Sequence, residues 1–170
     1  METTRKRLLN IMVGFTVAQL LIGATALAAQ GDCRPSFDAG SKALDTPAHL
    51  YSTTNIGGTT QTVESIYAAG AIYIKFGGEW SLSPITMQET KDRTQKNRQN
   101  SKATCRYLRD EPVNGEMAAV YSVHEESPTG KVDSQIWISK GKGLPLRLES
   151  EVDKIHSSTR YEYGNVKPPM

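Results

Sequence analysis

The chain has 170 residues, of which 20 are Lys or Arg and 18 are Asp or Glu, a formal net charge of +2. The first 28 residues hold three basic residues and one acid, which leaves 17 of each sign in the remainder. A remainder without net charge has no broad attraction for nucleic acid, so we expect no nucleic-acid partner. Its length of about 140 residues suits one domain with one modest core.

The N-terminus has the pattern of a secretory signal peptide. Basic residues at 5–7 precede an apolar run over 8–27, which ends in the small-residue pattern Ala26-Leu27-Ala28. We therefore predict a signal peptide over 1–28 and one β-rich domain over 29–170, in the periplasm or secreted. The apolar run also has the length of a membrane-spanning helix, so a retained anchor is the alternative.

Both cysteines, Cys33 and Cys105, fall in the exported part of the chain. An oxidising compartment and an even number of cysteines favour one disulfide between them. Such a bond would close a loop of about 70 residues, which is worth roughly 4 kcal/mol in the chain-entropy description. Two free thiols, one of them catalytic, are the alternative.

The first part of the domain is expected to form one short helix and then strands. Phe37, Ala43 and Leu44 give the segment 36–47 its apolar positions, and Pro47 marks the end of a helix there. Thr, Val, Ile and Tyr dominate the residues that follow, with glycine pairs between the runs. These runs predict strands over about 49–55, 59–68, 71–76 and 79–82.

Residues 83–103 are almost without apolar side chains, and the part from 89 to 102 carries five basic and two acidic residues. A helix without an apolar stripe is either fully solvated or unstable, so we interpret about 84–103 as a polar, basic excursion. One interpretation is a mobile surface segment. The other is a flap that meets anionic lipid or an acidic partner. The partner-binding residues would then be Lys91, Arg93, Lys96 and Arg98.

Strands return after residue 103, beginning with 104–113 and the hairpin signal Asn114-Gly115. Further runs predict strands over 116–126, 131–140, 144–152 and 157–166. We expect about seven or eight strands in the whole domain, fewer than the nine runs, with no βαβ alternation. This pattern predicts an α+β, mainly β fold, in which a meandering antiparallel sheet packs on a short N-terminal helix.

Sequence motifs for catalysis or metal binding are weak. The segment 141–145, GKGLP, lacks the spacing of a phosphate loop, and a strand rather than a helix follows it. His49, His124 and His156 are too far apart in sequence to form a spaced ligand pair, and no G-x-S-x-G is present. We therefore expect no enzyme activity, no metal and no cofactor.

Apolar residues on the predicted strands are the remaining candidates. Alternation places Leu144, Leu146 and Leu148 on one face of their strand, and Ile136 and Ile138 on one face of theirs. One short helix covers a limited area, so some apolar surface is left to meet a partner or to form a groove. The candidate ligand-binding residues, as core or groove, are Ile72, Ile74, Tyr121, Ile136, Ile138, Leu144, Leu146 and Leu148.

The stretch 104–169 resembles the outer-membrane lipoprotein carrier (LolA-like) superfamily. The similar features are a V-x-G strand start at Val113 and Gly115, the run WISKGKGLPLR from Trp137 to Arg147, and Tyr163 to Val166 near the end. The resemblance implies a strongly curved antiparallel sheet, an open half-barrel covered by helices. It also implies that the concave face holds acyl chains of lipoproteins or other lipids.

Two functions follow as expectations. The first is an exported, non-enzymatic protein that binds an apolar or acylated ligand, a lipid or a lipoprotein, on the concave face of its sheet. The alternative is a protein–protein interaction module of the cell envelope that uses the basic segment 89–102.

Overall fold

The computed structural model describes residues 31–128 and 130–169, so the predicted signal peptide lies outside the described part. The described residues form two helices, α1 (Arg34–Asp45) and α2 (Met87–Asn100). Nine strands are present, rather than about seven or eight: β1 (Ala48–Ile56), β2 (Thr59–Ala68), β3 (Ala71–Phe76), β4 (Glu79–Leu82), β5 (Lys102–Val113), β6 (Glu116–Ser127), β7 (Gly130–Ser139), β8 (Pro145–Val152) and β9 (Ile155–Tyr163).

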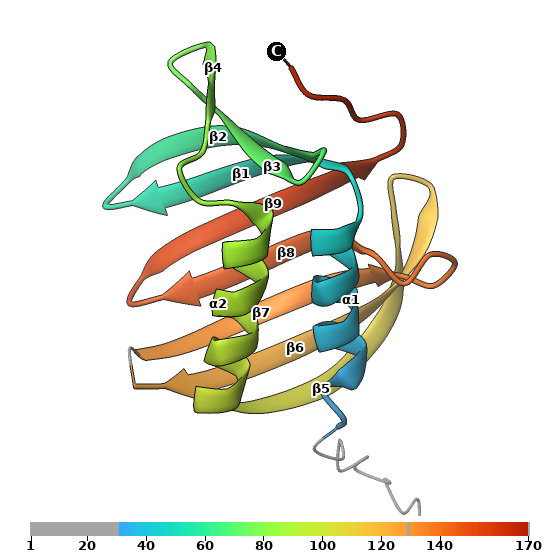
Figure 1. Cartoon of the computed structure of the whole chain (residues 1–170). Coiled ribbons are helices and arrows are strands. Elements are labelled where there is room, and N and C mark those ends of the chain that lie inside the picture. Colours follow the sequence, from blue (N-terminus) through green and yellow to red (C-terminus); the bar gives the residue numbers. More distant parts are fainter. Residues whose placement is uncertain (1–30, 129, 170) are drawn as a thin grey trace, which may run out of the picture.

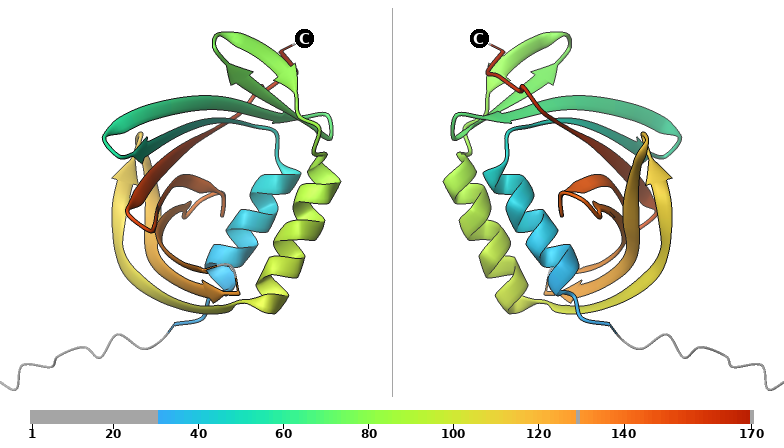
Figure 2. Two further views of the ribbon diagram at one scale, coloured as in Figure 1. Left: turned by 90° about the vertical axis from the view of Figure 1, so that its left-hand side faces the viewer. Right: turned by 90° about the vertical axis from the view of Figure 1, so that its right-hand side faces the viewer.

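All nine strands form one sheet in the order β4-β3-β2-β1-β9-β8-β7-β6-β5, with antiparallel pairing throughout. The sheet has two edges, β4 and β5, and α2 is the connection that crosses from one edge to the other. The sheet curves strongly, and both helices lie side by side in its hollow (Figures 1 and 2). The predicted mainly β fold with a curved antiparallel sheet is confirmed.

The core on the concave face lies under α1. Ala39 of α1 packs with Cys105, Val123, Ile136 and Ile138 of the sheet. Cys33 and Cys105 form the predicted disulfide, with a Cα–Cα distance of 5.1 Å. Cys33 is also the N-cap of α1, so the disulfide fixes the start of this helix to β5. The helix begins two residues before its predicted start, because Pro35 fits the first helical turn.

A second cluster lies on the outer, convex face. It contains Ala118, Val120, Trp137 and Leu146. The prediction that Leu144, Leu146 and Leu148 share one face is wrong, because Leu148 packs against the α1 cluster and Leu146 against Trp137. The register shifts between Trp137 and Ile138, where β8 has one residue more than β7. This bulge turns Leu146 outward.

The segment predicted as a polar, basic excursion forms the helix α2. The Thr86 hydroxyl accepts from the Glu89 N–H (3.1 Å) and the Glu89 carboxylate accepts from the Thr86 N–H (2.8 Å), a complete capping box. Met87 is the buried residue of α2. Neither of the two described helices has the length and apolar character that a membrane crossing requires.

Polar contacts hold α2 against α1. The Arg98 guanidinium lies over the Phe37 ring, with 4.9 Å from Cζ to the ring centroid. It donates to the Ser41 hydroxyl (2.8 Å) and to the Phe37 carbonyl (2.9 Å). The Lys91 ammonium pairs with the Asp45 carboxylate. A helix with almost no apolar residues is therefore ordered by side-chain contacts that hydrophobic periodicity does not register.

The segment 137–149 forms the end of β7, a turn and the start of β8. The Gly143 N–H donates to the Ser139 carbonyl (2.8 Å), and the Ser139 N–H donates to the Leu144 carbonyl (2.8 Å). Gly143 has a φ of 63°, a conformation that favours glycine. The Ser139 and Gly143 N–H groups bond within the turn and the Lys140 N–H donates to the Met117 carbonyl (2.9 Å), so these donors are not available to a phosphate group.

Candidate functional site

Four of the predicted ligand-binding residues meet on the concave face beneath α1. Ile136 and Ile138 belong to the cluster around Ala39, and Tyr121 and Leu148 pack against it. Ile136 and Ile138 are 8% and 7% exposed, so they form core rather than an open groove.

The other predicted ligand-binding residues lie elsewhere. Ile72 is buried and Ile74 half-buried on β3, near the opposite edge of the sheet. Leu144 is buried in the turn before β8, and Leu146 lies in the outer cluster. The structure therefore does not bring the eight candidates together as one surface.

Beside this core, the concave face is lined by hydroxyl groups. Register places Ser134, Ser150, Ser157 and Thr54 next to one another on β7, β8, β9 and β1. Thr54 Oγ1 and Ser157 Oγ are 3.1 Å apart, and the neighbouring pair Ser52 Oγ and Thr159 Oγ1 are 2.9 Å apart. We call these six residues the hydroxyl strip. It makes this part of the concave face polar.

An apolar row follows at the ends of the same strands. Val152 faces Ile155 across the β8–β9 pair, and alternation places Val132 of β7 and Ile56 of β1 on the same concave side. Ile56 is 50% exposed and Val152 36% exposed, while Val132 and Ile155 are half-buried. We call these four residues the rim row. It is a partly exposed apolar surface on the concave side of the sheet.

A pocket of about 480 Å³ lies between α2 and the rim. Asn97 and Asn100 of α2 form one wall, and Glu125, Pro128 and Val132 belong to the other. Val132 is part of both the pocket and the rim row. Apolar side chains on one side and amide or carboxylate groups on the other suit a ligand that is itself part apolar and part polar.

Two half-buried tyrosines occupy the sheet at the other end of β9. The Tyr161 and Tyr163 rings stack with centroids 6.2 Å apart, and the Tyr163 hydroxyl donates to the Pro145 carbonyl (2.8 Å). Burial raises the pKa of both phenols well above 10, their ordinary value. The phenols therefore stay uncharged near neutral pH, which suits packing rather than acid–base catalysis.

The four predicted partner-binding residues differ in their surroundings. Lys91 and Arg98 contact α1 through the ion pair and the hydrogen bonds described above. Arg93 and Lys96 are exposed on α2. An interaction through this helix would therefore use Arg93 and Lys96, whereas Lys91 and Arg98 serve the packing of the two helices.

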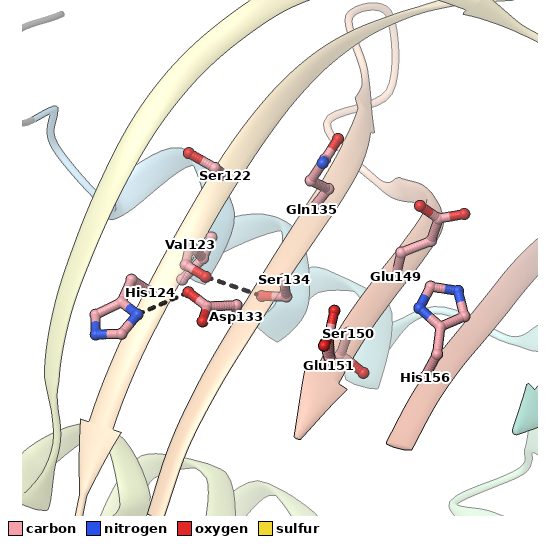
Figure 3. Close-up of a pocket in the computed structure, with 10 residues that line it drawn as sticks. All are labelled: Ser122, Val123, His124, Asp133, Ser134, Gln135, Glu149, Ser150, Glu151 and His156. Atoms are coloured by element: carbon pink, nitrogen blue, oxygen red, sulfur yellow. Dashed lines mark hydrogen bonds and ion pairs between the residues drawn. The ribbon is translucent and has the colours of Figure 1, made fainter. Parts of the chain in front are cut away.

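The outer face carries a shallow pocket of about 280 Å³ near the same strand ends (Figure 3). Register aligns His124, Asp133, Glu151 and His156 across β6, β7, β8 and β9. His124 Nδ1 lies 2.7 Å from the Asp133 carboxylate. Within residues 31–128 and 130–169, no group of three or more such side chains is arranged to hold a metal ion.

The titration of His124 tests this outer pocket. Hydrogen bonds with Asp133 and then Glu126, which also pairs with Lys131, raise the pKa of His124 above 6.5. Protonated His124 therefore contributes its full stabilisation of the fold below pH 6.5. This contribution is lost as the pH rises through the pKa of His124 in the folded protein. An NMR titration should give a pKa above 6.5 that falls in Asp133→Asn and is unchanged in Glu79→Gln. A wild-type value at or below 6.5 would contradict this pairing.

Comparison of the sequence with protein-family models finds no match, and comparison with curated proteins finds none either. Solved structures do match. LprF from Mycobacterium bovis has a TM-score of 0.52 at 11% identity, over 80% of this chain and 94% of that chain. MucB has a TM-score of 0.51 at 13% identity, over 82% of this chain and 62% of MucB.

A structure of the Pseudomonas aeruginosa MucA/MucB complex matches with a TM-score of 0.50 at 12% identity, over 81% of this chain and 59% of that chain. This chain therefore spans about three-fifths of the MucB length. At sequence identities this low, the matches show that the folds are similar and nothing more. The chain has a LolA-like fold, as the resemblance of residues 104–169 implied.

Proposed function

We propose that this chain is an exported, non-enzymatic binding protein that takes an apolar or acylated ligand on the concave face of its sheet. The observation that carries the proposal is the rim row, a partly exposed apolar surface beside the pocket of about 480 Å³ that Asn97 and Val132 line. The Cys33–Cys105 disulfide supports export, because such bonds persist in oxidising compartments.

The shape of this surface suits one acyl chain. Neighbouring strands lie about 4.8 Å apart, so a chain laid across β7, β8, β9 and β1 would follow the rim row for roughly 14 Å. Each methylene group removed from water there contributes about 0.8 kcal/mol. The hydroxyl strip beside the row offers donors and acceptors to a polar head group. A single-chain amphipathic lipid or an acylated peptide is therefore the ligand class that fits best.

Native mass spectrometry of the protein purified from membrane-containing cells tests this function. A bound lipid or acylated peptide is expected, and extraction with organic solvent should release it and leave the bare protein mass. A preparation that carries no such adduct and takes up no lysophospholipid on titration would overturn the proposal.

A second candidate is an envelope interaction module that uses α2. Its support is that MucB, which has the same fold, is solved in complex with MucA, and that Arg93 and Lys96 are exposed. Replacing Arg93 and Lys96 with Gln should weaken capture of an acidic partner, most strongly at low salt, because exposed charges are screened. Arg106→Gln with Lys154→Gln, also exposed, is the matched control. Equal capture by both variants would count against this candidate.

A further inference from the structure

A row of aromatic and charged side chains crosses the outer face of the sheet. Register places them directly opposite one another on seven successive strands. From β7 to β4 the row reads Trp137, Arg147, Arg160, Tyr51, Glu64, Lys75 and Trp80. Next to Trp137 in this row, two arginines face each other across the β8–β9 pair. Like charges directly opposite on neighbouring strands are unfavourable, so this pair needs compensation.

Part of that compensation comes from the fold. The Arg147 guanidinium lies over the Trp137 ring, with 4.8 Å from Cζ to the ring centroid. The Arg160 guanidinium lies over the Tyr51 ring at 4.3 Å on the other side. Each also pairs with a glutamate two residues further along its strand. These contacts hold both guanidinium planes in place, and each group keeps donors beyond those used, since arginine has five N–H bonds.

A pocket of about 240 Å³ lies at this arginine pair. Its lining residues are Val113, Asn114, Leu146, Arg147, Ser158 and Arg160, and we call it the arginine pocket. A neighbouring pocket of about 430 Å³ shares Asn114 and Arg160 and adds Lys142 and Glu116. Guanidinium, hydroxyl and amide donors thus come from two strands, β8 and β9, and from the β5–β6 turn. Donors that converge from several directions match a tetrahedral oxyanion better than a planar one.

We propose that the arginine pocket binds a phosphate monoester group, with Arg147 and Arg160 as its main ligands and Ser158 and Asn114 as supporting donors. On binding, the phosphate oxygens accept from the guanidinium N–H groups that Glu149 and Glu162 leave unused. This site lies on the outer face, so it is separate from the acyl-ligand site proposed for the concave face. The phosphate could belong to a soluble molecule or to a lipid head group, which the experiment distinguishes.

Isothermal titration calorimetry of residues 29–170 with inorganic phosphate is the first arm of the test. Saturable binding is expected, and Arg147→Gln or Arg160→Gln should weaken it by roughly tenfold or more. Arg109→Gln is the matched control, because Arg109 pairs in the same way with Glu111 two residues away but does not line the pocket. Arg160→Lys keeps the positive charge but lacks the planar set of guanidinium donors, so it should lose less phosphate affinity than Arg160→Gln. This graded loss distinguishes weakened binding from misfolding.

The second arm uses vesicles of phosphatidylcholine with and without phosphatidic acid. Capture on phosphatidic acid that Arg160→Gln abolishes assigns the site to a lipid head group, whereas binding of free phosphate alone assigns it to a soluble ligand. No binding in either arm would overturn the proposal, as would an equal loss in Arg109→Gln. The Ile56→Asp variant of the rim row should bind phosphate normally, so failure of one site is distinguishable from failure of the other.

Discussion

A Cys33→Ser, Cys105→Ser double variant is expected to lose about 4 kcal/mol of its free energy of unfolding. The disulfide joins residues 72 positions apart, so its removal frees a long loop in the unfolded chain. It also holds the N-cap of α1 against β5 at a point where Cys105 is only 1% exposed. The loss should therefore appear together with exposure of the apolar surface beneath α1.

Urea unfolding of the oxidised protein and of the double variant measures this difference. Reduction of the wild-type chain is the matched control, because it breaks the same bond without changing either side chain to serine. A loss below about 1 kcal/mol in both samples would contradict the role given to the disulfide, since native disulfides of small exported domains typically contribute about 2–5 kcal/mol.

Trp137→Ala is expected to lower the free energy of unfolding by about 3–5 kcal/mol. Trp137 is 3% exposed at the centre of the outer cluster, where it packs with Val120 and Leu146. The Arg147 guanidinium lies over its ring, so the substitution removes a cation–π contact as well as the apolar contacts. The two losses come from one ring, so they cannot be separated in this variant.

Trp80→Ala is the control for that substitution, because Trp80 is the other tryptophan on the outer face but is half-buried on the edge strand β4. Its loss of unfolding free energy should be less than half as large, since fewer atoms leave a packed environment. Chemical denaturation of both variants gives the comparison. Equal losses would show that the outer cluster contributes no more than the sheet edge.

Strand positions were predictable where hydrophobic alternation and turn residues agree. Residues 59–68, 71–76 and 79–82 are strands with the expected bounds, and Asn114-Gly115 forms the expected hairpin with φ values of 50° and 81°. A two-residue hairpin turn of this kind needs both residues in the left-handed region, which Asn and Gly tolerate best. The Asp153-Lys154 turn has φ values of 46° and 70° without a glycine, so its residues give no such signal.

The packing of α2 on α1 and the bulge at Leu146 were beyond sequence reasoning for different reasons. The order of α2 depends on Arg98 and Lys91 reaching α1, contacts between residues more than 40 positions apart. The bulge inserts one residue into a strand whose alternation otherwise continues, and a single extra residue reverses the facing of a side chain. Local patterns contain neither piece of information.

The candidate sites depend on register, which explains why sequence reasoning found them only in part. Val132, Val152, Ile155 and Ile56 become one surface because β7, β8, β9 and β1 are neighbours, although β1 is remote from the others in the chain. The same holds for Arg160 and Tyr51 on the outer face. The sequence predicted apolar strand faces, and the strand order decides which of them end up beneath α1 and which stay exposed.

The central claim is that the rim row binds an acyl chain, and displacement of a fluorescent fatty acid by lysophosphatidylcholine tests it most directly. The wild-type chain should bind saturably, and Ile56→Asp with Val152→Asp should weaken binding by roughly tenfold or more, because two or three buried methylene groups account for that factor. Phe76→Asp with Leu82→Asp, at residues 72% and 59% exposed outside the rim row, should bind like wild type. No saturable binding by the wild-type chain, or the same loss in both double variants, would contradict the account.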